Sequence, residues 1–370
     1  MAQASQEFGE WPLKRLMTEV VGSGHKSADD MSREQAREAM QRILAGEPDP
    51  TTLGAFWLAN RWKRNTPEEL AAYADVVREE SVVTAEPDCD PVDCGANYDG
   101  KHTSAVLGVG AGLVAAAAGT PVVVHSGDRV PTQKACAYKH VLDELGVRTE
   151  LDPAESAEMV DEIGFGFYYQ PAFNPGIHDL YDRRDQMGVR TFVNTIETVG
   201  NPANASVHLG SFYHLAFAKK MCSLVTESER LEYDRVIMFQ GMEGYDDVRP
   251  GYTKVAEWEA PRASEESSGD EPRAADGAFD DYEIETATFG MEMESEDLEV
   301  DDLEGDSARI TEAVLAGERE DHFADAVALN GAFRIYARRD VDSIEEGLEV
   351  ARGVIEDGSA ADALAELRGF

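Results

Sequence analysis

The chain has 370 residues and a formal net charge of −40, with 73 Asp and Glu residues against 33 Lys and Arg. Its hydrophobic fraction of 42% is ordinary for a globular protein, so the chain has enough apolar residues to form a core. Its length allows one large domain, or a small domain beside a large one. The charge argues against broad nucleic-acid binding, which needs Lys and Arg against phosphate. The acids are spread along the whole chain, which indicates a surface adapted to a salt-rich cytoplasm whose ions screen self-repulsion.

Cysteine usage and hydropathy point to a cytoplasmic protein. Cys89, Cys94, Cys136 and Cys222 form no CxxC pair, so reduced thiols are expected rather than disulfides or a zinc site. The first residues do not show the basic segment, apolar segment and small-residue cleavage site, in that order, that are typical of a signal peptide. The uncharged stretch 103–124 is rich in Gly and Ala, and it predicts a buried helix followed by a buried strand rather than a membrane span.

Residues 12–82 are predicted to form a small all-helical domain. Leu13, Leu16 and Val20 fall on one helical face. Ser32 begins a Ser-Arg-Glu-Gln capping box, which predicts the start of a second helix. A third helix is expected after Pro50. A fourth is expected after Thr66, which precedes a Pro at the first position of that helix.

From residue 93 onwards apolar runs alternate with helical patterns, which predicts an α/β domain over residues 88–370. Residues 261–281 are rich in Ser, Glu, Asp, Gly and Ala without periodicity, so a disordered acidic insertion is expected there. The expected strands are 121–125, 191–194, 236–240 and 282–289, and the expected helices are 139–145, 307–315, 325–338 and 343–355.

Two candidate binding loops follow predicted strands, where α/β proteins hold ligands. In residues 93–104, a Gly- and Asn-containing turn could present backbone N–H groups to phosphate, with Lys101, Thr103 and Ser104 adding donors. In residues 125–129, His125 and Arg129 could hold an anion. The alternatives are a plain strand–turn–helix connection and a structural histidine.

Two further candidates are charged pairs. Asp246 and Asp247 follow another predicted strand, and carboxylates on a loop suit Mg²⁺, although an adjacent acidic pair arises easily by chance in so acidic a chain. Arg183 and Arg184, with Arg190 nearby, could bind a carboxylate or phosphate, or make surface ion pairs with the many acids.

These sites occur in the order and approximate spacing found in anthranilate phosphoribosyltransferases, and the chain resembles that family over nearly its whole length. The resemblance implies a helical domain, with a contribution from about residues 174–200, beside a larger α/β domain with a mixed, mostly parallel sheet. The segments that carry it are Leu13–Met17, Ala45–Pro48, Ala55–Arg61, Thr66–Leu70, Gly164–Phe167, Gln170–Pro175, Met187–Asn194, Gly200–Ala203, Ala326–Tyr336 and Gly358–Leu364.

The resemblance also implies an activity: ribose 5-phosphate passes from phosphoribosyl diphosphate to an aromatic amine, anthranilate or an analogue, in a Mg²⁺-dependent reaction of a homodimer. The family's diphosphate loop falls on residues 95–99, where Asn97 and Tyr98 replace glycines. The residues it assigns to the donor are Gly95, Asn97, Asp99, Gly100, Lys101, Thr103, Ser104, Arg129 and Lys134.

The remaining family roles fall on five residues. Arg184 matches the arginine that faces anthranilate, His125 matches a catalytic-loop histidine, and Asn174 stands in the acceptor turn. Asp246 and Asp247 match the metal-binding acidic pair.

Two other functions fit the altered diphosphate loop. One is a non-catalytic paralogue that binds nucleic acid or a nucleotide through clustered Arg, despite the net charge. The other is a pyrimidine nucleoside phosphorylase, because residues 101–104 (Lys-His-Thr-Ser) resemble the phosphate-binding Lys-Thr-Ser of those enzymes.

Overall fold

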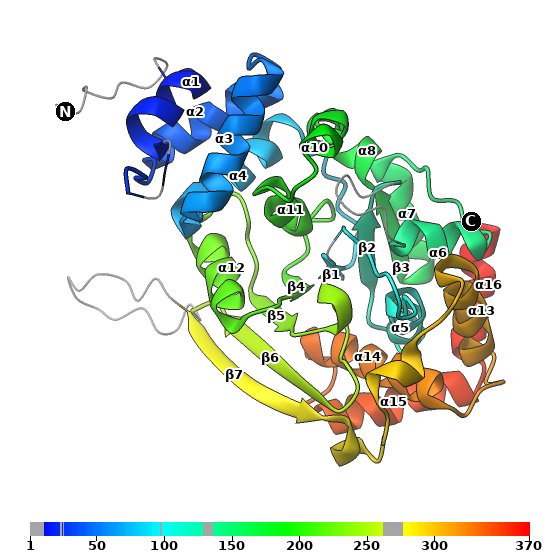
Figure 1. The fold of residues 1–370 in the computed structure, drawn as a ribbon. Helices are drawn as coiled ribbons and strands as arrows, with labels where there is room; N and C mark the ends of the chain where they lie inside the picture. The colour runs from blue at the N-terminus through cyan, green and yellow to red at the C-terminus, as the bar shows by residue number, and fades with distance from the viewer. Residues whose placement is uncertain (1–10, 23, 25, 97, 129–135, 262–276) are drawn as a thin grey trace, which may run out of the picture.

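The computed structural model describes residues 11–22, 24, 26–96, 98–128, 136–261 and 277–370. An N-terminal group of helices lies on one side of the molecule, above a twisted sheet that is covered on its other face by C-terminal helices (Figure 1). The N-terminal elements are α1 (Leu13–Leu16), the π-helix η1 (Met17–Val21), α2 (Arg33–Leu44), α3 (Pro50–Lys63) and α4 (Pro67–Glu80).

Local capping sets the starts of these helices, as predicted. Ser32 and Gln35 form a reciprocal capping box at α2, and Thr66 and Glu69 form another at α4. Asp49 caps α3 ahead of Pro50 at its first position.

The central sheet has seven strands in the order β3-β2-β1-β4-β5-β6-β7. The first five run parallel, whereas β6 and β7 are antiparallel, so the prediction of a mixed, mostly parallel sheet is confirmed. The strands are β1 (Val92–Cys94), β2 (Val122–Ser126), β3 (Phe165–Tyr169), β4 (Val207–Ser211), β5 (Arg235–Phe239), β6 (Tyr252–Glu259) and β7 (Ala278–Glu285).

The two faces of the sheet belong to different hydrophobic clusters. On β5, Ile237 and Phe239 pack into the cluster formed with the C-terminal helices, while Val236 and Met238 pack with the N-terminal helices, as the two-residue period of a strand requires. The helices of the first cluster are α5 (Gly108–Ala117), α6 (Tyr138–Glu144), α7 (Pro153–Ile163), α13 (Leu303–Leu315), α14 (His322–Ala337), α15 (Ile344–Glu356) and α16 (Ser359–Gly369).

The segment 174–200 joins the N-terminal cluster, to which Ile177, Phe192 and Ile196 contribute. We therefore propose that residues 12–82 and 174–200 form one helical unit, beside a larger α/β unit. The short helices there are α9 (Pro175–His178), α10 (Tyr181–Met187), α11 (Val193–Ile196) and the 3-10 helix η2 (Glu197–Val199); α8 (Gln170–Phe173) precedes them, and α12 (Leu215–Glu227) packs on the same side.

Several sequence predictions are corrected. Residues 191–194 lead into helix α11 rather than forming a strand, because Asn194 accepts a bond from the Thr191 N–H and fixes a turn. Residues 278–281, expected to be disordered, pair with β6 as the start of β7, and 286–289 form the 3-10 helix η5 instead of extending that strand. Residues 262–276 of the predicted insertion lie outside the described part. A last helix, α16, follows the one expected to end the chain.

The uncharged stretch 103–124 forms α5 and β2, both buried, as expected. Within the described part of the chain, no helix is both long and apolar enough to cross a membrane.

Candidate active site at the carboxyl edge of the sheet

Three of the predicted site segments lie at the carboxyl ends of parallel strands, where α/β folds hold ligands. The loop 95–104 leaves β1, His125 lies near the end of β2, and residues 241–247 follow β5 with the short 3-10 helix η3 (Met242–Gly244). Gly95 is required at the start of its loop, since a Cβ there would lie 1.8 Å from the carbonyl oxygen of Thr198.

The predicted donor loop is filled by its own side chains. Tyr98 is buried, and its hydroxyl is hydrogen-bonded to Nδ1 of His125. Asp99 is buried and ion-paired with Arg190. Gly100 adopts a φ of 71°, in the left-handed region that favours glycine. Asn97, Arg129 and Lys134, also predicted to bind the donor, lie outside the described residues.

The acidic pair is buried and neutralised by two internal cations. Lys101 Nζ is ion-paired with Asp247 and donates to the Ala105 carbonyl at 3.0 Å. Asp246 accepts from Arg334 at 3.0 Å and also from the Tyr138 hydroxyl. Burial raises the pKa of Asp247, and the Lys101 ammonium opposes that rise only in part.

The acidic pair has the donor chemistry that Mg²⁺ prefers. Among the described residues, however, no group of three or more His, Cys, Asp or Glu is placed to hold a metal ion. Asp246 and Asp247 would have to release Arg334 and Lys101 before their oxygens could bind a cation.

A backbone anion site is occupied by a carboxylate of the chain itself. Glu243 accepts the N–H groups of His102, Thr103 and Ser104 at 2.5, 3.2 and 2.9 Å. The Thr103 and Ser104 hydroxyls, expected to face phosphate, donate to the same carboxylate at 3.1 and 2.8 Å. Glu243 has a φ of 54°, a strained value for a residue with a Cβ. These contacts therefore hold a strained residue in place.

The Glu243 contacts predict a pH-dependent contribution to stability. Burial alone would raise the pKa of Glu243, but the N–H and hydroxyl donors outweigh it and lower the pKa from 4.5 to about 2. A depressed carboxyl pKa stabilises the fold above the unfolded value and loses that contribution as pH falls towards the folded value. We expect Glu243→Gln to be less stable than the wild type at pH 6, with the gap narrowing between pH 4.5 and 2, as measured by urea unfolding. A difference in unfolding free energy that stays constant from pH 4.5 to pH 2 would contradict the contacts of the Glu243 carboxylate. The control is Glu294→Gln, which changes an exposed residue.

Arg184, the predicted acceptor arginine, is sealed in the core. Its guanidinium binds both oxygens of Glu197 at 2.8 and 2.7 Å, and neither side chain is more than 1% exposed. Asn174 is also buried, and its carboxamide oxygen accepts the Ser81 hydroxyl at 2.6 Å. The acceptor roles of Arg184 and Asn174 stay predictions.

His125 belongs to a buried polar cluster centred on Asp93 of β1. Nε2 of His125 lies 3.2 Å from Asp93, and Nδ1 of His208 lies 2.9 Å from the other oxygen of the same carboxylate. Tyr233 donates its hydroxyl to Asp93 at 3.0 Å. Burial alone would raise the pKa of Asp93, but the two imidazoles outweigh it and hold the pKa well below its ordinary value.

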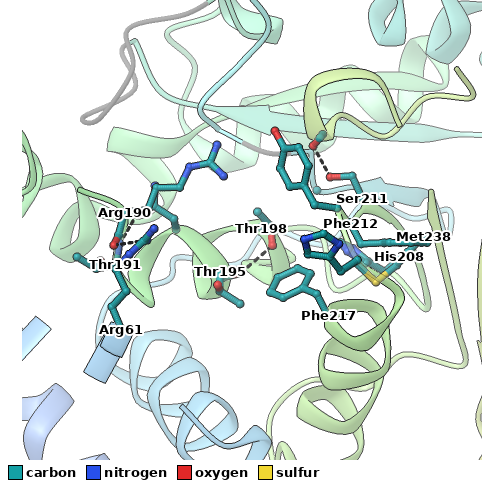
Figure 2. A pocket seen from close by; sticks show the side chains of 15 residues that line it. Arg61, Arg190, Thr191, Thr195, Thr198, His208, Ser211, Phe212, Phe217 and Met238 are labelled. Carbon is teal, nitrogen blue, oxygen red and sulfur yellow. Dashed lines mark hydrogen bonds between the residues drawn. The ribbon is translucent and has the colours of Figure 1, made fainter. Parts of the chain in front are cut away.

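An open cavity of about 290 Å³ lies beside this cluster, at the same edge of the sheet (Figure 2). Its wall includes Gly95 from the donor loop, Gly244 from the acidic loop and His208 from β4. The other lining residues are Arg61, Arg190, Thr191, Asn194, Thr195, Thr198, Ser211, Phe212, Tyr213, His214, Phe217 and Met238.

The structure brings Gly95, Lys101, Asp246 and Asp247 to the same edge of the sheet, and their roles there stay predictions. Nothing in the sequence indicated that Arg334 pairs with Asp246, or that Glu243 binds the loop at 102–104, because these partners are far apart in the chain. A signal existed for Asp93 and His208, which interrupt otherwise apolar strands.

Comparison with known proteins identifies the family. Residues 92–361 match the α/β domain of a glycosyl transferase family, and residues 19–81 match that family's helical bundle domain. The chain belongs to this glycosyl transferase family. An anthranilate phosphoribosyltransferase of Methanocorpusculum labreanum is 32% identical over 92% of this chain and 94% of its own. One from Bordetella pertussis is 33% identical over 88% and 90%.

Solved structures of the family share the fold. The anthranilate phosphoribosyltransferase of Thermus thermophilus superposes with a TM-score of 0.74 at 27% identity, covering 92% of this chain and 96% of its own. The Saccharomyces cerevisiae enzyme in complex with PRPP and Mg has a TM-score of 0.75 over 91% of this chain and 93% of its own; at 20% identity it supports the fold alone.

Proposed function

We propose that this glycosyl transferase family member is a phosphoribosyltransferase that transfers ribose 5-phosphate from phosphoribosyl diphosphate to an aromatic amine, anthranilate or an analogue. The observation that carries the proposal is full-length similarity to anthranilate phosphoribosyltransferases through both domains. It is supported by the convergence of the donor loop and the acidic loop on one edge of the sheet.

The donor is proposed to bind at the loop 95–104. Its diphosphate would take the N–H and hydroxyl donors of Thr103 and Ser104 that Glu243 holds in the free protein. Lys101 would exchange Asp247 for the diphosphate, since an ammonium favours the greater negative charge. Mg²⁺, when bound, would neutralise the diphosphate, and Asp246 and Asp247 are the residues proposed to hold it.

The direct test is an activity assay with phosphoribosyl diphosphate, anthranilate and MgCl₂ in concentrated KCl. Loss of anthranilate fluorescence with release of diphosphate would support the proposal. No product from any aromatic amine, with the protein folded, would overturn it. Phosphate-dependent cleavage of uridine would favour the nucleoside phosphorylase alternative, and retention of single-stranded nucleic acid would favour the binding paralogue.

We infer a homodimer formed through the N-terminal helices. Trp62 and Leu58 of α3 are 68% and 46% exposed, and they line an apolar groove with Met17 and Val21. Apolar side chains this exposed are typical of an interface. We expect the wild type to sediment as a dimer and Trp62→Glu as a monomer in analytical ultracentrifugation. The control is Val83→Glu, which changes an exposed apolar residue outside the groove. A monomeric wild type would contradict the assignment.

We also infer a cytoplasmic location and adaptation to salt. The four cysteines are free, which fits a reducing compartment. With a net charge of −40, the midpoint of thermal unfolding is expected to rise with KCl, because the screening length falls from about 10 Å at 0.1 M to about 3 Å at 1 M. Differential scanning fluorimetry from about 0.1 M to about 1 M KCl measures the midpoint of thermal unfolding, with sucrose as the uncharged control. A midpoint that does not change with KCl would contradict the inference.

A further inference from the structure

The loop at 102–104 forms a concave anion site that faces one carboxylate of the chain. The backbone N–H groups of His102, Thr103 and Ser104 all donate to the carboxylate of Glu243, and so do the two hydroxyls of this loop. Successive N–H groups that converge in this way form an anion-binding concavity in proteins. His102 and Thr103 are exposed and Glu243 is only partly buried, so an anion from solution can reach the site.

The donor side of the site is held by contacts that do not involve Glu243. The Val300 N–H donates to the Thr103 carbonyl at 2.9 Å. The Ala105 N–H donates to the Leu298 carbonyl at 3.0 Å. These two bonds tie the loop to a neighbouring segment, so its N–H groups keep their direction when the carboxylate leaves.

The Glu243 side of the contact can open without unfolding the acidic loop. The backbone there is held from the end of β4 and the segment after it, since the Tyr213 hydroxyl donates to the Glu243 carbonyl at 2.7 Å. The Ser211 hydroxyl is hydrogen-bonded to the carbonyl of the next residue, Gly244. The Glu243 side chain reaches the loop at 102–104 from this fixed backbone, and rotation about its own bonds would free the donors.

The contact places an internal anion in competition with any anion from solution. Burial alone would raise the pKa of Glu243, but the backbone donors lower it to about 2, so the carboxylate is charged at neutral pH. A carboxylate on the same chain needs no association step, so it holds the donors against a weakly binding anion. A diphosphate carries more negative charge and more acceptor oxygens, so it makes stronger charge-assisted bonds to the same donors.

We propose that Glu243 is an autoinhibitory latch: its carboxylate closes the anion site at 102–104 in the free protein and weakens diphosphate binding there. This inference rests on the proposed phosphoribosyl transfer, whose donor supplies the diphosphate. The apparent dissociation constant is the intrinsic constant divided by the fraction of molecules in which the carboxylate has left the site. If that fraction is about one in ten, removing the carboxylate tightens binding by about tenfold.

Calorimetry with inorganic diphosphate, without Mg²⁺, measures the latch directly. Glu243→Gln keeps the size of the side chain but removes its charge, and it is expected to bind diphosphate about tenfold more tightly than the wild type. Glu243→Gly suits the φ of 54° at this position, so it should fold and show the same gain. The matched control is Glu349→Gln, which removes an exposed carboxylate on α15 and should leave the dissociation constant within about twofold.

A variant of the loop locates the bound anion. Thr103→Val, made in the Glu243→Gln protein, removes one hydroxyl donor and should weaken diphosphate binding by about tenfold, the loss of one hydrogen bond to a charged group. Tighter binding in Glu243→Gln that Thr103→Val leaves unchanged would place the anion elsewhere and overturn the latch.

The other outcomes separate the latch from the proposed reaction. A residue that only supports the loop would weaken binding when it is replaced, so weaker or unchanged affinity in both folded Glu243 variants would overturn the latch. Absence of diphosphate binding by the wild type and both variants would overturn it as well. Tighter binding in both variants without transfer to any aromatic amine would keep the latch and reject the proposed transfer. Transfer by the wild type with unchanged diphosphate affinity in the variants would keep the reaction and reject the latch.

Discussion

Replacing Arg184 by methionine is expected to lower the free energy of unfolding by about 3–5 kcal/mol, because it leaves Glu197 buried without its counter-charge. The double variant Arg184→Met/Glu197→Leu should recover most of this loss, since a buried ion pair contributes little beyond an apolar pair of similar volume. Urea unfolding monitored by circular dichroism measures both.

Arg183 offers a matched control for this experiment. It is exposed, so Arg183→Met should change the unfolding free energy by no more than about 0.5 kcal/mol. If Arg184→Met lowers the free energy of unfolding by less than about 1 kcal/mol, Arg184 and Glu197 do not form a buried ion pair. Arg184 would then be available for the acceptor role that the family resemblance implies.

The double variant Asp246→Asn/Asp247→Asn is expected to lower Mg²⁺-dependent turnover by about 100-fold or more, because the carboxylates proposed to hold the metal are worth several kcal/mol to the reaction. Arg334 and Lys101 would also lose their buried counter-charges, so unfolding must be followed in parallel. Turnover is measured by loss of anthranilate fluorescence across a MgCl₂ series.

The chain contains a matched acidic pair for this test. Asp280 and Asp281 lie on strand β7 at the edge of the sheet, far from the carboxyl-edge loops in sequence. Asp280→Asn/Asp281→Asn should leave turnover within twofold of the wild type. Unchanged turnover and unchanged Mg²⁺ dependence in Asp246→Asn/Asp247→Asn would remove the metal assignment.

Local signals in the sequence predicted only part of the fold: of the seven strands, β2, β5 and part of β7 were expected from them. The capping residues Ser32 and Thr66 set helix starts as expected, because a cap is satisfied within one turn of its own helix. The apolar runs predicted as strands at 121–125 and 236–240 form the buried parallel strands β2 and β5, each shifted by one residue. Residues 191–194 were wrongly predicted as a strand, since a four-residue segment with two apolar residues, Phe192 and Val193, has no clear periodicity and fits either element.

The site could be predicted only in part, because its chemistry depends on residues far apart in the chain. The spacing of Asp246 and Asp247 placed them correctly at a strand end, but Arg334 lies 88 residues from Asp246 and Lys101 lies 146 from Asp247. Glu243 reaches the loop at 102–104 across about 140 residues. Nothing local to these positions indicates that carboxylates and donors would satisfy one another within the fold.

The most direct measurement of the central proposal is calorimetric titration of phosphoribosyl diphosphate into the protein in concentrated KCl, with and without MgCl₂. We predict binding that strengthens with Mg²⁺ and that loses this Mg²⁺ dependence in Asp246→Asn/Asp247→Asn, because the two carboxylates are proposed to hold the metal. The donor must also displace Glu243 from its N–H donors and Lys101 from Asp247. Absence of binding by the folded wild-type protein would mean that these internal contacts replace the donor permanently, and it would contradict the assignment as a phosphoribosyltransferase.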